Sequence, residues 1–221
     1  MQNRHMERSA AYSGIVGAIL YIIAGLIPGA PPSATESAAQ VSGYVTAHSG
    51  ALAIAAWLTL PAVAFILWFA IGLFDYLRDQ NNTDRTLAQW GVAGAVVWTA
   101  LNVVAVSLMG AAAIHNPGAG ASFMVLYLFN IVMFVFSFGS FAAFAFAAAN
   151  ESRRRGAMPG WLNAFGYLVF IVDALFTLTI FGNPGTAFAI TGVGTMVTPL
   201  LSAVWVLVAS IVLLVRIPKT A

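Results

Sequence analysis

Residues 51–74 read ALAIAAWLTLPAVAFILWFAIGLF and contain no Asp, Glu, Lys, Arg or His. As an α-helix, this run extends about 36 Å, which is enough to cross the roughly 30 Å hydrocarbon core of a bilayer. A helix satisfies all of its backbone hydrogen bonds within one segment, as a chain in lipid must. The stretch therefore predicts a transmembrane helix.

Five further apolar stretches flank this one along the chain. The six predicted spans cover residues 12–30, 51–74, 87–114, 123–149, 161–181 and 195–215. The first run has about 19 residues, more than the roughly 7–15 of the apolar part of a signal peptide, so we expect a retained helix. The sequence thus predicts an all-α polytopic membrane protein, with residues 1–221 forming one bundle of six transmembrane helices.

The composition agrees with this class. The chain is 61% apolar and 7% charged, with a mean hydropathy of +0.90, whereas soluble domains are roughly 45–50% apolar and about 25% charged. The lipid bilayer is therefore the expected partner. Nine basic residues against seven acidic ones give no strongly basic surface, so we expect no nucleic-acid binding. The chain has no Cys, which excludes disulfides and thiolate chemistry; no cofactor is identified.

The basic residues occur in alternate connections only. They precede the first span, separate the second from the third and the fourth from the fifth, and follow the sixth: Arg4, Arg8, Arg78, Arg85, Arg153, Arg154, Arg155, Arg216 and Lys219. Loops rich in Lys and Arg stay in the cytoplasm. Both termini are therefore predicted to be cytoplasmic, in a plasma (inner) membrane of bacterial type.

A short amphipathic helix is predicted outside the membrane, between the first two spans. Ser33-Ala34-Thr35-Glu36 has the S-x-x-E form of a capping box, which starts a helix. From there, helical spacing places five residues on one face: Ala34, Ala38, Val41, Val45 and His48. This helix is either a connector that covers the end of the bundle or a lid over a binding cavity.

Asp173 is the one formal charge inside the six spans. An ionised carboxylate at that depth costs at least ~2.5–3.5 kcal/mol, and no Lys or Arg within a span can pair with it. It is therefore either protonated or in contact with water, a cation or hydrogen-bond donors. The donors expected at similar depth are Asn102 and Asn130, with Tyr127, Thr99, Thr177 and Thr179 as secondary candidates.

Two interpretations of this polar cluster remain open. Asp173, Asn102, Asn130 and Tyr127 could form a clasp between helices, in which each bond contributes ~0.6–2 kcal/mol. They could equally form a proton, cation or ligand site, because ionisable residues inside a membrane often serve function.

A metal site at the outer surface is a weaker hypothesis. His48 precedes the second span and His115 follows the third, so the two imidazoles could lie at the same outer edge near Glu36. Imidazole and carboxylate groups ligate Zn or Cu. No metal-binding spacing supports the idea, and histidines at the membrane interface are the alternative.

Residues 123–149 are rich in Phe and Tyr, which indicates packing and lipid contact or, alternatively, a flat apolar ligand such as a quinone, carotenoid or sterol. Small residues four apart allow close helix approach and occur at Gly25 with Gly29, Gly91 with Ala95, and Ala143 with Ala147.

Three segments resemble a known family. They are residues 38–48 (AAQVSGYVTAH), residues 73–78 (LFDYLR) and residues 158–162 (MPGWL). They are similar to segments of the DUF4386 family of six-helix bacterial membrane proteins. The resemblance implies this topology and assigns no activity or catalytic residue, and it does not place Asp173 in the pattern of that family.

Three classes of function remain. The first is a protein that binds a small molecule or lipid, or an accessory subunit that packs in a larger membrane complex or against copies of itself. The second is an ion- or proton-coupled transporter that uses Asp173. The third is a membrane enzyme acting on a lipid or isoprenoid through Glu36, His48 and His115. The absence of hydrolase, metalloprotease, P-loop and dinucleotide motifs favours the first.

Overall fold

The computed structural model describes residues 2–29, 32, 36–77, 85–115, 121–181 and 194–217, without a strand in these ranges. They form α1 (Gln2–Leu26), α2 (Ala38–Ala47), α3 (Ser49–Tyr76), α4 (Thr86–His115), α5 (Ala121–Arg155), α6 (Gly160–Thr177), a 3-10 turn η1 (Leu178–Phe181) and α7 (Gly194–Arg216). All of these helices except α2 are long and apolar enough to cross a membrane. The predicted all-α, six-span architecture is confirmed.

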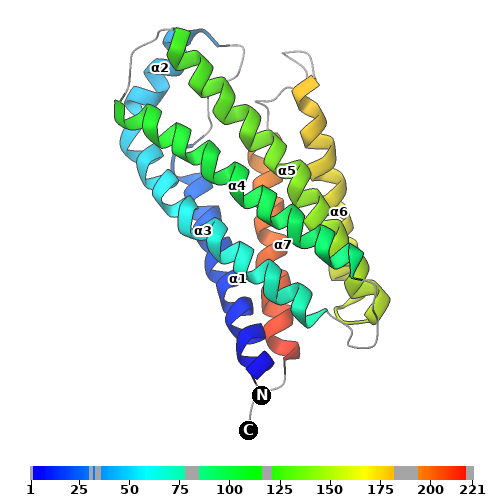
Figure 1. Cartoon of the computed structure of the whole chain (residues 1–221). Helices are drawn as coiled ribbons and strands as arrows, with labels where there is room; N and C mark the ends of the chain where they lie inside the picture. Colours follow the sequence, from blue (N-terminus) through cyan, green and yellow to red (C-terminus); the bar gives the residue numbers. More distant parts are fainter. Residues whose placement is uncertain are drawn as a thin grey trace.

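The six long helices pack as a closed ring. Each of α1, α3, α4, α5, α6 and α7 contacts the next in this order, and α7 returns to α1. Both termini lie at one end of the bundle, and α2 lies at the other (Figure 1). Helix ends place Arg8, Arg85, Arg153–Arg155 and Arg216 near the termini. We call this the arginine end and the opposite one the α2 end; Arg78 and Lys219 lie outside the described residues.

Helix α1 differs from the predicted first span at both ends. It begins at Gln2 instead of residue 12 and ends at Leu26 instead of residue 30. Similarly, α5 continues to Arg155, beyond the predicted end at residue 149. Hydropathy locates the apolar part of a helix, but charged residues can continue a helix past the hydrocarbon core. Arginines in the last turn of α5 also interact favourably with the helix dipole.

The arginine end is closed by a tight connection between α5 and α6. Gly156 follows α5 with φ of +61°, a left-handed conformation that Gly adopts without strain. From across the bundle, the Arg216 guanidinium donates a hydrogen bond to the carbonyl of the next residue, Ala157, at 2.7 Å. This bond ties the end of α7 to the α5–α6 connection.

Helix α2 begins later than the sequence predicted. The Ser37 hydroxyl accepts a hydrogen bond from the Gln40 amide N–H, and the Ser37 N–H donates to the Gln40 side chain at 2.9 Å. The capping box at the start of α2 is therefore S-x-x-Q at Ser37 and Gln40, whereas Ser33 of the predicted S-x-x-E box lies outside the described residues. Val41 and Val45 are fully buried, which confirms the apolar face, whereas His48 is exposed.

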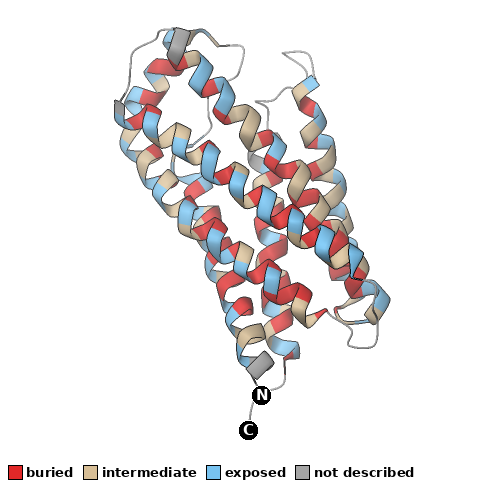
Figure 2. Cartoon of the chain, viewed as in Figure 1, coloured by how far each residue is buried: buried red, intermediate tan, exposed pale blue. Residues whose placement is uncertain are grey.

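Aromatic rings fill the interior between the helices. The Trp98 ring of α4 meets Phe141 of α5 at 5.3 Å between centroids, and Phe144 meets Trp205 of α7 at 5.5 Å. The outer faces carry exposed apolar side chains such as Trp57 (71% exposed), and exposed and buried residues alternate along each helix (Figure 2). Such faces suit contact with lipid.

Small residues allow α4 and α5 to approach closely. A Cβ atom added at Gly94 would lie 2.7 Å from the Ser140 carbonyl oxygen, and one added at Gly91 would lie 2.7 Å from the Ala147 side chain. The predicted close approach is thus confirmed for α4 and α5. It was wrong for Gly25 and Gly29, because no described atom lies within 4 Å of a Cβ at either position.

Candidate functional site

Asp173 is fully buried and bonds to a residue of the neighbouring helix. The Ser202 hydroxyl of α7 lies 3.1 Å from Asp173 Oδ1 and 3.0 Å from Oδ2. Within the described ranges, no ion pair reaches the carboxyl group. The structure therefore gives Asp173 a hydroxyl partner, and not the Asn102 or Asn130 side chain that the sequence suggested.

Ser202 has more acceptors in reach than it has protons. Its hydroxyl also lies 3.0 Å from the Thr198 carbonyl oxygen, one turn earlier in α7. A hydroxyl donates one proton. A neutral Asp173 can donate to Ser202 Oγ while Ser202 donates to Thr198, whereas an ionised Asp173 would have to draw the Ser202 proton away from Thr198. Both hydrogen bonds are complete only with a neutral carboxyl group.

Asn102 belongs to a second polar contact inside the bundle. The Tyr21 hydroxyl of α1 donates to Asn102 Oδ1 of α4 at 3.0 Å, and Asn102 Nδ2 donates to the Trp98 carbonyl at 3.0 Å. The middle of the bundle thus holds two separate hydrogen-bonded pairs, Asp173–Ser202 and Tyr21–Asn102.

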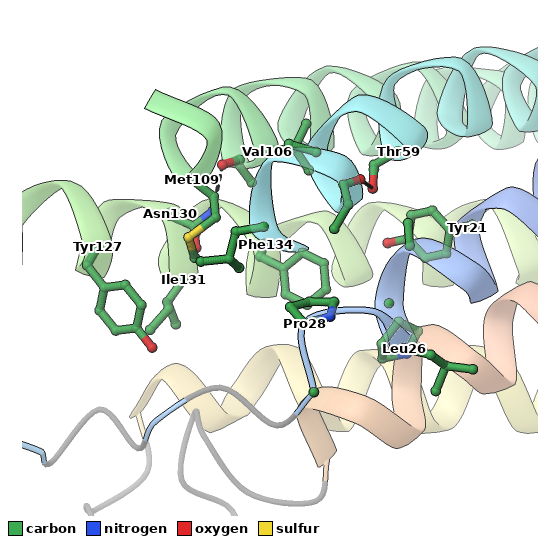
Figure 3. A pocket seen from close by; sticks show the side chains of 18 of the residues that line it. Tyr21, Leu26, Pro28, Thr59, Val106, Met109, Tyr127, Asn130, Ile131 and Phe134 are labelled. Atoms are coloured by element: carbon green, nitrogen blue, oxygen red, sulfur yellow. Dashed lines mark hydrogen bonds between the residues drawn. The ribbon is translucent and has the colours of Figure 1, made fainter. Parts of the chain in front are cut away.

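A cavity of about 220 Å³ lies in the half of the bundle next to α2. Its wall is formed by the last turns of α1, Tyr44 of α2 and parts of α3, α4, α5 and α7. Figure 3 shows Tyr21 and Thr59 at one end of this space, Tyr127 at the other, and Asn130 with Phe134 between them. Among the described residues, the lining contains no Asp, Glu, Lys, Arg or His side chain.

The cavity separates the predicted polar cluster into two parts. Asn130 and Tyr127 line it, whereas Asp173 and Asn102 do not. Asn130 Nδ2 donates to the Ala105 carbonyl of α4 at 2.6 Å. Asn130 and Tyr127 are therefore placed to contact a molecule inside the cavity, while Asp173 and Asn102 lie deeper in the bundle.

Two tyrosines fix the chain between α1 and α2 beside the cavity. The Tyr44 hydroxyl donates to the Pro28 carbonyl at 2.8 Å, and the Tyr127 hydroxyl donates to the Pro32 carbonyl at 3.2 Å. Burial raises the pKa of Tyr44 above its usual value of 10.0, so its phenol stays protonated and able to donate at neutral pH. The two bonds hold this part of the chain against α2 and α5.

The metal hypothesis remains a prediction. The described residues contain no group of three or more potential metal ligands, but the His115 side chain lies outside them. His48 is exposed; its Nδ1 lies 2.9 Å from the Tyr44 carbonyl oxygen, and its ring stacks on that of Tyr44 at 4.4 Å. The contact with the Tyr44 carbonyl therefore occupies one of the two imidazole nitrogens of His48.

Sequence reasoning missed Tyr21, Tyr44 and Ser202. Ser202 could have been found by matching depths, because it lies 14 residues before Arg216 and Asp173 lies 13 residues after Gly160, about 20 Å from the same end in each case. Tyr21 and Tyr44 gave no signal, since a single tyrosine in an apolar helix has many possible contacts.

No family model, curated protein or solved structure matches the chain. The resemblance to the DUF4386 family therefore stays a prediction, and the geometry of the cavity and of the Asp173 contact carries the functional argument.

Proposed function

We propose that the protein binds an apolar small molecule or lipid in the cavity next to α2. The protein would lie in a plasma membrane of bacterial type, with its arginine end in the cytoplasm because Lys- and Arg-rich loops stay there. The cavity and α2 would then face outward. The observation that carries the proposal is a cavity of about 220 Å³ whose lining holds no charged side chain among the described residues.

The size and lining of the cavity suit an apolar occupant. Ligand sites are mostly apolar concave spaces with a few placed polar groups, and here those groups are Asn130, Thr59 and the tyrosines. An apolar cavity of about 150 Å³ stays dry and binds benzene. By proportion, this cavity takes about nine non-hydrogen atoms, either a small molecule or one end of a lipid.

The position of Asp173 favours binding over ion-coupled transport. A carrier that loads a proton or cation at Asp173 needs a path to it, yet this carboxyl group is fully buried and does not line the cavity. The enzyme hypothesis has less support, because the described lining offers no carboxylate, imidazole or amine to act as acid or base. An accessory role in a larger membrane complex is compatible with a binding cavity.

Photolabelling with a matched pair of glycine variants tests the proposal. Gly25 lines the cavity, and a Cβ added there meets no described atom within 4 Å, so Gly25→Leu adds bulk at the cavity without a backbone clash. Gly50→Leu is the control, because Gly50 has the same free space in α3 but does not line the cavity. The probe is an aliphatic diazirine hydrocarbon of about ten non-hydrogen atoms, added to the purified full chain in detergent.

We expect saturable labelling of cavity residues in the wild type and in Gly50→Leu, and its loss in Gly25→Leu. Mass spectrometry of the labelled peptides gives the positions. Labelling confined to exposed outer positions such as Trp57 and Phe65 in the wild type would contradict the proposal.

A further inference from the structure

The cavity wall contains five side chains that can donate hydrogen bonds: Tyr21, Tyr44, Thr59, Tyr127 and Asn130. Which of these donors remain free decides what kind of polar group a bound molecule can carry. A molecule that leaves a buried polar group unpaired binds more weakly, because the desolvation of that group is not compensated.

Donors at the inner end of the cavity are all engaged within the protein. The Tyr21 hydroxyl donates to Asn102 Oδ1 at 3.0 Å, and the Thr59 hydroxyl donates to the Ala55 carbonyl at 2.8 Å. Each hydroxyl has one proton. Neither group can donate to a ligand without breaking its present bond.

Donors nearer α2 are engaged as well, except that the Asn130 amide carries two N–H groups and keeps one of them free among the described residues. Tyr44 and Tyr127 donate to the carbonyls of Pro28 and Pro32, and Asn130 Nδ2 donates to the Ala105 carbonyl at 2.6 Å. The backbone adds no free donor here, because Pro28, Pro32 and Pro199 of the lining have no N–H. Most of the other described lining residues lie inside helices, where their N–H groups bond to carbonyls of the same helix.

Acceptors, by contrast, remain available. In the described part of the chain no group donates to Asn130 Oδ1, and this oxygen is not fully enclosed by protein atoms. The hydroxyl oxygens of Tyr21, Tyr127 and Thr59 keep lone pairs that their donated bonds do not use. The wall therefore presents acceptors to whatever occupies the cavity.

We propose that the ligand is an uncharged apolar molecule that carries a hydrogen-bond donor, namely an alcohol, and that Asn130 Oδ1 accepts its proton. This inference rests on the proposed binding function and narrows its ligand class. A ketone or quinone carries acceptors only, so its oxygen could accept from the remaining N–H of Asn130 but could not pair with Asn130 Oδ1 or the hydroxyl oxygens of the wall, whereas an alcohol can do both. A hydrocarbon would leave Asn130 Oδ1 unpaired but would meet no repulsion.

Menthol and menthone form a matched probe pair for this inference. Both have one six-membered carbon ring and 11 non-hydrogen atoms, roughly the size expected for the cavity, and they differ only in a hydroxyl against a carbonyl group. Each is used to displace the diazirine hydrocarbon from the purified full chain in detergent, at concentrations corrected for partition into micelles. We expect menthol to displace the probe at about three- to tenfold lower concentration, the factor given by one net hydrogen bond.

Asn130→Leu should abolish the preference, because leucine has a similar volume without the amide oxygen. Ser137→Ala is the control, since Ser137 is buried on the same helix and does not line the cavity. It should keep the preference. Retained diazirine labelling of the cavity shows that each variant is folded.

The outcomes separate this inference from the proposed function. Absence of cavity labelling in the wild type overturns the binding function itself. Labelling that menthol and menthone displace equally, or that menthone displaces better, overturns the alcohol inference and leaves the binding function standing. A menthol preference that survives in Asn130→Leu overturns the assignment of Asn130 as the acceptor. The wild-type comparison decides the ligand class even if Asn130→Leu does not fold.

Discussion

The Ser202 hydroxyl of α7 is nearly equidistant from the two carboxyl oxygens of Asp173 on α6, at 3.0 and 3.1 Å. In the described residues, α6 and α7 share the least extensive contact of any two neighbours in the helix ring. This polar contact therefore joins the ring where packing contributes least.

Removing the hydroxyl should weaken this junction. Ser202→Ala leaves the buried Asp173 without its partner, which costs about 1–3 kcal/mol of unfolding free energy. Asp173→Asn should cost less, about 1 kcal/mol or below, because an amide can donate to Ser202 Oγ as a neutral acid does. The measurement is the thermal midpoint of the purified protein in detergent.

Ser210→Ala provides the control for that comparison. Ser210 is buried on the same helix, and within the described residues its hydroxyl bonds only to the Val206 carbonyl of its own helix. An equal loss of stability in Ser202→Ala and Ser210→Ala would show that the contact with Asp173 contributes nothing.

Tyr44→Phe should loosen the connection between α1 and α2. It removes the hydrogen bond to the Pro28 carbonyl, for a loss of about 0.5–1.5 kcal/mol. The pKa of Tyr44 is raised by burial in the folded protein, so the contribution is complete below about pH 10, the pKa of an unfolded tyrosine, and is lost as the pH rises through the raised value. The stability difference between wild type and variant should therefore be constant from pH 7 to pH 9.

Thermal midpoints of the wild type and Tyr44→Phe at several pH values check this constant difference, and Tyr12→Phe is the control. Tyr12 is 52% exposed, so loss of its hydroxyl should change stability by less than about 0.5 kcal/mol. A Tyr44→Phe difference that already disappears between pH 7 and pH 9 would be inconsistent with the raised pKa.

Substitution by alanine should destabilise the protein at Gly94 and stabilise it at Gly25. At Gly94, an alanine Cβ would lie 2.7 Å from the Ser140 carbonyl oxygen, so α4 and α5 must separate, at a cost of about 1–3 kcal/mol. At Gly25 the Cβ is free, and Gly→Ala in a helix stabilises by about 0.5–1 kcal/mol. Thermal midpoints measured in parallel decide the matter; a tolerated Gly94→Ala would mean that the α4–α5 interface is looser than described.

The features of the fold that the sequence predicted correctly depend on local properties of the chain. The six spans follow from long apolar runs, and the common end of the termini follows from an even number of crossings. The start of α2 was placed a few residues too early, because S-x-x-E at Ser33 and S-x-x-Q at Ser37 both have the form of a capping box and α2 begins after Ser37. Local signals cannot distinguish the two.

The contacts between helices could not be predicted in the same way. Whether Asp173 meets Asn102, Asn130 or Ser202 depends on how each helix is rotated about its axis, and the hydrophobic pattern of an all-apolar helix does not define that rotation. The cavity is likewise lined by residues of α1, α2, α3, α4, α5 and α7, so no single segment encodes it.

The position of the diazirine label along the chain tests the central claim most directly. The binding account predicts saturable label on cavity residues such as Met109, Ile131 and Phe134 in the wild type and in Gly50→Leu, and loss of that label in Gly25→Leu. Label found only on outward-facing residues, or equal cavity labelling in Gly25→Leu and the wild type, would contradict it.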